Sequence, residues 1–288
     1  MKNIFKNLAL VLVLGCSSFS SVAFAEVYYN DPTQDTLWDD FTYKLSLADI
    51  RQGAKNGDPK AEYLLGELYL TYTEVVDISQ DYDKALPLLQ SSWKKHGADA
   101  GHALFRVYYN GLGVKKDLSV AFKYLQESAE MGYTLSQRDL AEAYRGKDYE
   151  GLVGQDYEEA IYWYKKAAAQ GDKNSALAMA NLYYQGEGVK QSNEKAFEWL
   201  LRCSKLKYGY ETQGFRSLAK FYEEGIGTDV DLIQAYKYYD LRGSAGAEGK
   251  QLLSKQMTKE QIEEARRQSL EWQKEHNVRI GGGFFQMN

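Results

Sequence analysis

An apolar stripe with the spacing of an α-helix recurs five times along this sequence. Each copy places a leucine or methionine, then an apolar residue, then a tyrosine at positions i, i+3 and i+4. The tyrosines follow one another at intervals of 39, 36, 39 and 39 residues, and they are Tyr69, Tyr108, Tyr144, Tyr183 and Tyr222. Repetition at a nearly constant period predicts an array of similar helical units.

A second helix is predicted in every copy. Its marker is an alanine that lies 13 or 16 residues after the tyrosine, at Ala85, Ala121, Ala160, Ala196 and Ala235. Four residues before each alanine stands an Asp or Ser, whose side chain can accept hydrogen bonds from the free N–H groups of a helix start. Glycines expected to end four of these helices in left-handed conformation are Gly97, Gly132, Gly171 and Gly246. The pattern therefore predicts five helix pairs without a β-sheet.

Glycine pairs mark a tight turn between the two helices of three copies: Gly111-Leu112-Gly113, Gly186-Glu187-Gly188 and Gly225-Ile226-Gly227. With the tyrosine, the capping residue and the alanine, they make the chain resemble the Sel-one-like repeat family over about residues 54 to 246. The resemblance implies an all-α, right-handed α/α solenoid of five Sel-one-like (TPR-like) helix-turn-helix repeats with terminal capping helices. A dinucleotide-binding loop is disfavoured, because the third glycine and the preceding strand are missing.

The flanks divide the chain into four expected parts. These are a signal peptide (1–25), an N-terminal extension with a capping helix (26–57), the repeat solenoid (58–257) and a C-terminal capping helix with a tail (258–288). Capping-box sequences begin at Ser46 and Thr258. A terminal repeat has one face without a neighbour, so an amphipathic helix with a charged outer side is expected to cover it.

The first 25 residues have the three parts of a secretory signal peptide. Lys2 and Lys6 precede an apolar run over residues 8–14, and small residues end the segment at Ala25. Seven apolar residues are too few to cross a bilayer, so we expect a periplasmic or secreted chain without a transmembrane segment, cleaved near Ala25. The alternative is a lipoprotein anchored through Cys16, because Val13-Leu14-Gly15-Cys16 resembles a bacterial lipobox.

Composition narrows the chemistry. The formal net charge of −5 disfavours nucleic-acid binding, which needs clustered positive charge. Only three histidines occur, in three different segments, and Cys203 is the single cysteine after the leader. No metalloprotease, zinc-ribbon or serine-nucleophile motif is present. We therefore expect no catalytic residue, no metal and no cofactor, with His102 on a solvated helix face and Cys203 in the core.

Protein binding is the remaining class of function. First helices of a helix-pair solenoid form its concave face, and their positions outside the core are candidate contacts. Three side chains directly follow the repeat tyrosines in consecutive repeats and are predicted to form an exposed strip: Tyr109, Arg145 and Tyr184. Further candidates on the same helices are His102, Arg106, Arg138 and Arg216. Tyrosine and arginine are enriched at interface hot spots, although an ordinary solvated face would have a similar composition.

Two loops form a second candidate site. The segments 71–80 and 145–155 are three residues longer than the other inter-helix loops and lack the glycine turn. Variable loops on a rigid scaffold often carry function, although the extra residues could also be neutral. Side chains predicted to be exposed at this loop edge are Val75, Val76, Ile78, Tyr149, Leu152 and Val153.

These observations favour a non-enzymatic protein-interaction scaffold in the bacterial envelope. Its expected partner is a protein, such as a toxin, an effector or an envelope component. The resemblance offers two alternatives. One is a periplasmic immunity protein that neutralises an interbacterial toxin such as a secreted phospholipase. The other is a protein that binds or hydrolyses peptidoglycan fragments or β-lactams, which is disfavoured because this chain lacks a cysteine series in its repeats.

Overall fold

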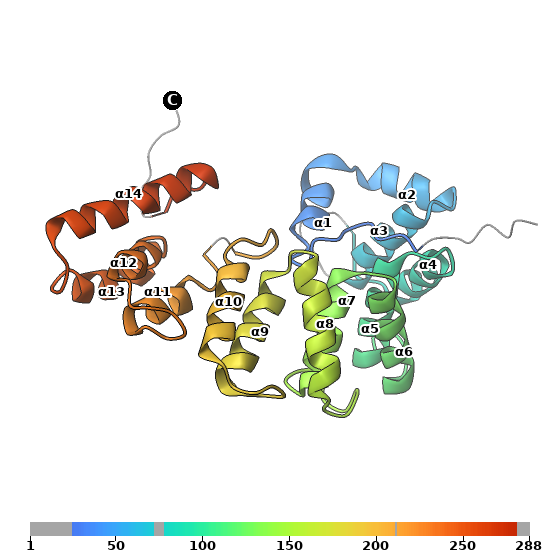
Figure 1. Ribbon diagram of the computed structural model, residues 1–288. Helices are drawn as coiled ribbons and strands as arrows, with labels where there is room; N and C mark the ends of the chain where they lie inside the picture. The colour runs from blue at the N-terminus through green and yellow to red at the C-terminus, as the bar shows by residue number, and fades with distance from the viewer. Residues whose placement is uncertain (1–24, 72–77, 211, 281–288) are drawn as a thin grey trace, which may run out of the picture.

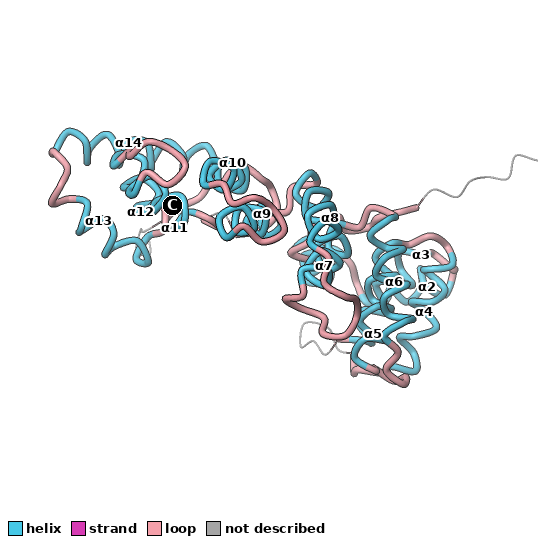
Figure 2. Tube along the Cα trace, turned by 60° about the horizontal axis from the view of Figure 1, so that its bottom comes forward, coloured by secondary structure: helices cyan, strands magenta, loops and turns pink. Residues whose placement is uncertain are grey.

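A computed structural model describes residues 25–71, 78–210 and 212–280 of the 288-residue chain. Fourteen α-helices within these ranges follow one another in a row of antiparallel pairs, shown in Figure 1. Figure 2 shows the same row curving from α2 to α14. Strand-type pairing within the described ranges is limited to two isolated backbone bridges. The predicted all-α solenoid of five helix pairs is confirmed.

Each repeat contributes a first helix and a second helix. The first helices are α3 (Pro59–Leu70), α5 (Ala98–Asn110), α7 (Thr134–Arg145), α9 (Lys173–Gln185) and α11 (Phe215–Glu224). The second helices are α4 (Tyr82–Lys94), α6 (Leu118–Glu130), α8 (Tyr157–Ala169), α10 (Asn193–Cys203) and α12 (Leu232–Asp240). Before them lie α1 (Asp35–Asp39), a π-helical turn (Asp40–Lys44) and α2 (Leu47–Lys55). After them lie a 3-10 turn (Gly243–Gly246), α13 (Ala247–Leu253) and α14 (Lys259–Glu275).

The second helices begin where the capping pattern predicts. All five expected residues accept hydrogen bonds from backbone N–H groups of the first turn: Asp81, Asp117, Asp156, Ser192 and Asp231. The C-terminal helix opens with a complete capping box at Thr258, and Ala265 on this helix is fully buried. Leu270 on the same helix is 58% exposed and lies on its outer side.

Small residues and stacked rings hold the pairs together. A Cβ atom on Gly66 would lie 2.7 Å from Leu89 of the paired helix, so a larger residue would separate α3 from α4. The repeat tyrosines are half-buried, and those of the second and fifth repeats stack on tyrosines of their second helices. The rings of Tyr108 and Tyr124 stack with centroids 5.7 Å apart.

The closing glycines behave in two different ways. Gly132 and Gly171 have φ of 100° and 105°, in the left-handed region as expected. Gly97 and Gly246 do not, so that expectation is wrong for both. His96 takes the left-handed conformation before Gly97, with φ of 68°. Gly246 is required for close approach instead, because a Cβ atom there would lie 1.8 Å from the carbonyl oxygen of Tyr239.

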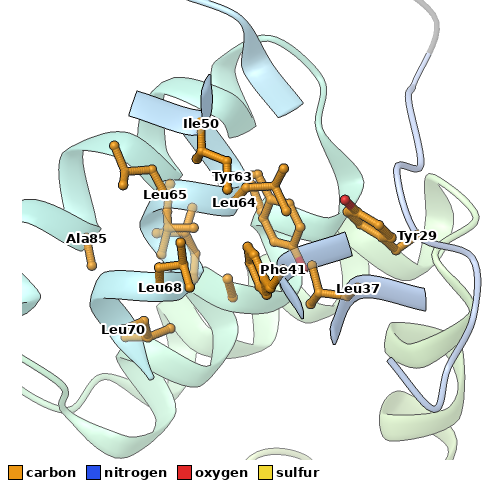
Figure 3. Packing of buried hydrophobic residues seen from close by; sticks show 14 of the residues in the cluster. Tyr29, Leu37, Phe41, Ile50, Tyr63, Leu64, Leu65, Leu68, Leu70 and Ala85 are labelled. Carbon is orange, nitrogen blue, oxygen red and sulfur yellow. The ribbon is translucent and has the colours of Figure 1, made fainter. Parts of the chain in front are cut away.

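The N-terminal extension is part of the folded core. Figure 3 shows Tyr29, Leu37 and Phe41 packed beside Tyr63 and the leucines of α3. The rings of Tyr29 and Tyr63 lie 6.2 Å apart, and the Tyr29 hydroxyl donates a hydrogen bond to Asp40. The extension therefore caps the first repeat with an aromatic cluster in addition to α2.

Candidate functional site

The N-terminal segment, defined as residues 26–34, runs past the starts of three first helices. Glu26 pairs with the backbone before α5, where its N–H donates to the His96 carbonyl and its carbonyl accepts from the Ala98 N–H, each at 2.9 Å. The Tyr28 and Tyr29 N–H groups donate to the two carboxylate oxygens of Asp99 at 2.8 and 3.0 Å. The first two repeats therefore hold this segment mainly through hydrogen bonds to the backbone groups of the segment.

The same segment reaches the third repeat. The Asn30 side chain accepts from the Thr134 hydroxyl and donates to Gln170 at 2.9 Å. The Pro32 carbonyl accepts from the Arg138 guanidinium at 3.3 Å. The N-terminal segment thus covers part of the first-helix face from α5 to α7. The later first helices, α9 and α11, remain available for other contacts.

Four adjoining hollows follow one another along α7, α9 and α11, and we call this series the groove; Pro32 and Thr33 of the N-terminal segment line the first hollow. Their volumes are about 300, 400, 210 and 400 Å³ in chain order. The first and second hollows share Arg138 and Asn174, the second and third share Asn181, and the third and fourth share Lys220. Because neighbouring hollows share lining residues, a single extended ligand could contact all four.

Ion pairs between consecutive repeats run beside the groove. Glu67 pairs with Arg106 at 3.1 Å and Arg138 with Asp172 at 3.3 Å. These pairs join first helices or their starts across one repeat boundary. Arg106 and Arg138, two predicted contact residues, therefore already have intramolecular partners, which restricts their freedom to bind another molecule.

His102 is not on a solvated face. It is 5% exposed, and its Nε2 atom lies 2.9 Å from a carboxylate oxygen of Asp139 on α7. Burial by itself raises the pKa of Asp139, but the hydrogen bond and charge of His102 and the nearby Arg138 bring that pKa below its ordinary value. The expected exposure of His102 is wrong because the next first helix covers this face.

The predicted strip of Tyr109, Arg145 and Tyr184 is not uniformly exposed. Arg145 is 9% exposed and forms an ion pair with Glu187 at 2.8 Å. Tyr109 is half-buried, with Tyr149 edge-on at a centroid distance of 5.5 Å. Tyr184 lines the third hollow of the groove, and Arg216 is exposed beside the fourth. Tyr184 is half-buried like Tyr109, so the expected exposure of the strip is wrong, whereas Arg216 is exposed as expected.

The loop edge also differs from its expected form. Val75 and Val76 lie outside the described residues. Ile78 and Leu152 are 9% and 8% exposed, and Val153 is half-buried in the central core cluster. Tyr149, with φ of 61°, packs edge-on against Phe105 at 5.2 Å. The prediction that these four side chains are exposed is wrong. Ile78 belongs to the N-terminal core cluster, and the loop 145–155 folds back over α5 and α7.

The remaining chemistry of the described residues is sparse. Burial raises the pKa of the Cys203 thiol to about 11, which keeps it protonated and unreactive at neutral pH. No group of three or more His, Cys, Asp or Glu side chains in the described ranges is arranged to hold a metal ion. None of the helices found there is long and apolar enough to span a membrane.

Stacked helix pairs with a groove along their first helices define this protein as an α/α repeat solenoid, a class that presents extended surfaces to other proteins. The chain belongs to the Sel1 repeat family. Matches to the Sel1 repeat cover residues 59–92, 98–133, 134–172, 174–207 and 216–241. These five segments coincide with the five helix pairs.

Relatives are distant and longer than this chain. An uncharacterised protein of Neisseria meningitidis serogroup B is 26% identical over 205 residues, which make up 71% of this chain and 40% of that protein. The chitin synthase regulator SKT5 of Saccharomyces cerevisiae is 28% identical over 216 residues, 72% of this chain and 30% of that protein. The crystal structure of a Sel1 repeat protein from Oxalobacter formigenes has a TM-score of 0.59 at 20% identity, and the match covers 76% of this chain and 89% of that one. The similarity to the Oxalobacter formigenes structure supports the solenoid fold of this chain.

Proposed function

We propose that this protein is a non-enzymatic scaffold of the bacterial envelope that binds a partner protein in the groove along α7, α9 and α11. The observation that carries the proposal is the continuity of the four hollows, which share lining residues from Arg138 to Lys220. The N-terminal segment occupies the face before α7, so the groove is the open part of the first-helix surface. Helix-pair solenoids use such surfaces for partner binding.

Site-specific photocrosslinking tests this proposal. A photoreactive amino acid at Asn181, an exposed residue shared by two hollows, should crosslink a discrete partner protein in cells that produce the chain. The matched control is the same amino acid at Glu198, which is exposed on the second helix α10. Identical adducts from both positions, or none from Asn181, would contradict the proposal. The identity of the crosslinked protein distinguishes an adaptor from an immunity protein, for which it would be a toxin.

Export to the envelope rests on the leader pattern of Lys2, Lys6, the apolar run and the small residues before Glu26. Mass spectrometry of the mature chain tests it. A chain that begins at Glu26 supports a signal peptide cleaved near Ala25, whereas a lipid-modified Cys16 at the N-terminus supports the lipoprotein alternative. Saturable β-lactam or peptidoglycan hydrolysis by the purified chain would contradict the non-enzymatic part of the proposal.

A further inference from the structure

The second hollow of the groove is rich in carboxylates. The second hollow is lined by the carboxylates of Asp139, Glu142 and Asp148 and by two guanidiniums. The Arg138 guanidinium pairs with Asp139 of this hollow at 3.7 Å and with Asp172 at 3.3 Å, and that of Arg145 pairs with Glu187. His102 engages Asp139, so Glu142 and Asp148 are the carboxylates of this hollow that no described ion pair includes. Burial raises the pKa of Glu142, and the charge of Arg145 opposes this rise.

The third hollow has an apolar wall beside neutral polar side chains. The third hollow lies between α9 and α11 and is lined by Tyr184, Leu200, Phe221 and Ile226. The Tyr184 ring is tilted against Phe221 at a centroid distance of 5.5 Å. Polar lining is limited to neutral side chains and Lys220 at the border of the next hollow. A hollow of about 210 Å³ with these walls suits an aliphatic or aromatic side chain.

The fourth hollow, which ends the groove, is basic. Arg216, Lys220 and Arg242 line the fourth hollow, where the one carboxylate in the lining is Glu248. Lys220 lies 3.6 Å from Glu224 on its own helix. No ion pair among the described residues includes Arg216 or Arg242. This end can therefore offer two guanidiniums to a carboxylate of a partner.

From this order of charges we infer that the groove binds an extended segment of a partner protein with a basic side chain at one end, an apolar side chain in the middle and an acidic side chain at the other end. The inference rests on the proposed function and adds the chemistry and direction of the bound segment. The third hollow separates the two charged hollows, so a segment that contacts both must be extended over several residues. Electrostatic complementarity of this kind sets the orientation and partner choice more than the affinity.

Charge-ordered peptides test the inference. The probes are fluorescein-labelled peptides of about nine residues. They have two lysines at one end, a central leucine and phenylalanine, two glutamates at the other end, and serines between. One peptide begins with the lysines and one with the glutamates. A third has the same composition with one lysine and one glutamate at each end. Fluorescence polarisation with the full chain should show one charge-ordered peptide binding about tenfold or more tightly than the mixed peptide.

Charge-reversed variants make the test specific for the groove. Glu142→Lys with Asp148→Lys should remove the preference, and the further addition of Arg216→Glu and Arg242→Glu should transfer it to the peptide of opposite order. Such a transfer requires a folded groove, so unfolding cannot produce it. The matched control, Lys165→Glu with Glu198→Lys, reverses charges on exposed residues of the second helices and should keep the original preference.

The outcomes separate the inference from the proposed function. Equal binding of all three peptides, weakened alike by Tyr184→Ala, would overturn the charge order and leave a protein-binding groove. Absence of peptide binding would overturn the inference, while the crosslink from Asn181 would still decide the function. Ordered peptide binding without any crosslinked protein would support the inference and contradict the function.

Discussion

At the scale of single residues, buried polar groups connect parts of the chain that are far apart in sequence. Asp99 accepts hydrogen bonds from the N–H groups of Tyr28 and Tyr29, and the buried Thr134 hydroxyl donates to the Asn30 side chain. His102 and Asp139 connect α5 to α7 in the same way. A buried polar group without a partner would cost roughly 1 to 3 kcal/mol, so each of these contacts helps to specify one arrangement of neighbouring repeats.

Asp99 should give the protein a characteristic pH dependence. Burial raises the pKa of Asp99 from 3.8 to about 7, although the Tyr28 and Tyr29 N–H groups oppose this rise. Between these two values the folded chain holds a proton that the unfolded chain has lost, so the Asp99 contribution to the free energy of unfolding decreases as the pH rises. Asp99→Asn should remove this decrease.

Urea unfolding at a series of pH values measures the effect as the difference between the parent and Asp99→Asn. The comparison isolates Asp99 because other titrating groups are common to both proteins. Parallel pH profiles of the two proteins over this interval would contradict the prediction.

At the scale of elements, the turns between paired helices depend on glycine for geometry. Gly227 has φ of 67°, and a Cβ atom there would lie 2.1 Å from the backbone carbonyl oxygen of Asn193. The turn of the fifth repeat therefore packs directly on the start of α10 in the fourth. The glycine pairs thus serve both the turn within a repeat and the contact between repeats.

Gly227→Ala should lower the free energy of unfolding by about 2 kcal/mol or more, because it combines a positive φ with overlap against backbone atoms. Gly154→Ala is the matched control. A Cβ atom at Gly154 meets no atom within 4 Å, and its φ lies outside the left-handed region, so its effect should stay within about 0.5 kcal/mol. Equal effects of the two substitutions in denaturant unfolding would show that the turn does not need glycine at position 227.

At the scale of the whole molecule, the N-terminal segment links the first repeat to the third, which the helix array connects only through the second repeat. Repeats of a solenoid contact their immediate neighbours, which keeps local perturbations local. Residues 26–34 contact the first, second and third repeats through Tyr63, Asp99 and Arg138. They therefore extend coupling over one half of the molecule and leave α9 to α14 outside it.

Hydrogen exchange should reveal this division. Tyr29→Ala removes the ring that packs on Tyr63, so the amides of Tyr28 and Ala98 should exchange faster, together with the start of α7. Exchange in α11 to α14 should remain as in the parent. Tyr210→Ala, which truncates a side chain that is 84% exposed, serves as the control and should leave both halves unchanged. Faster exchange throughout the chain after Tyr29→Ala would mean that the solenoid opens as one unit.

Much of this architecture was predictable because local signals repeat. The stripe of apolar residues, the capping Asp or Ser and the glycine pairs act within one helix or turn, and five copies reinforce one another. The helix pairs, the five capped starts and the opening of α14 at Thr258 follow from residues close together in sequence. The burial of Cys203 and the glycine turns between paired helices could be predicted for the same reason.

Burial on the first-helix face was decided by tertiary structure alone. His102 and Arg145 look like surface residues within their own helices, but their partners Asp139 and Glu187 are 37 and 42 residues away. No local rule showed that the N-terminal extension would lie along three repeats. Local periodicity determines which side of a helix is apolar, whereas the stacking of repeats determines which polar side chains are covered, and that stacking also formed the groove.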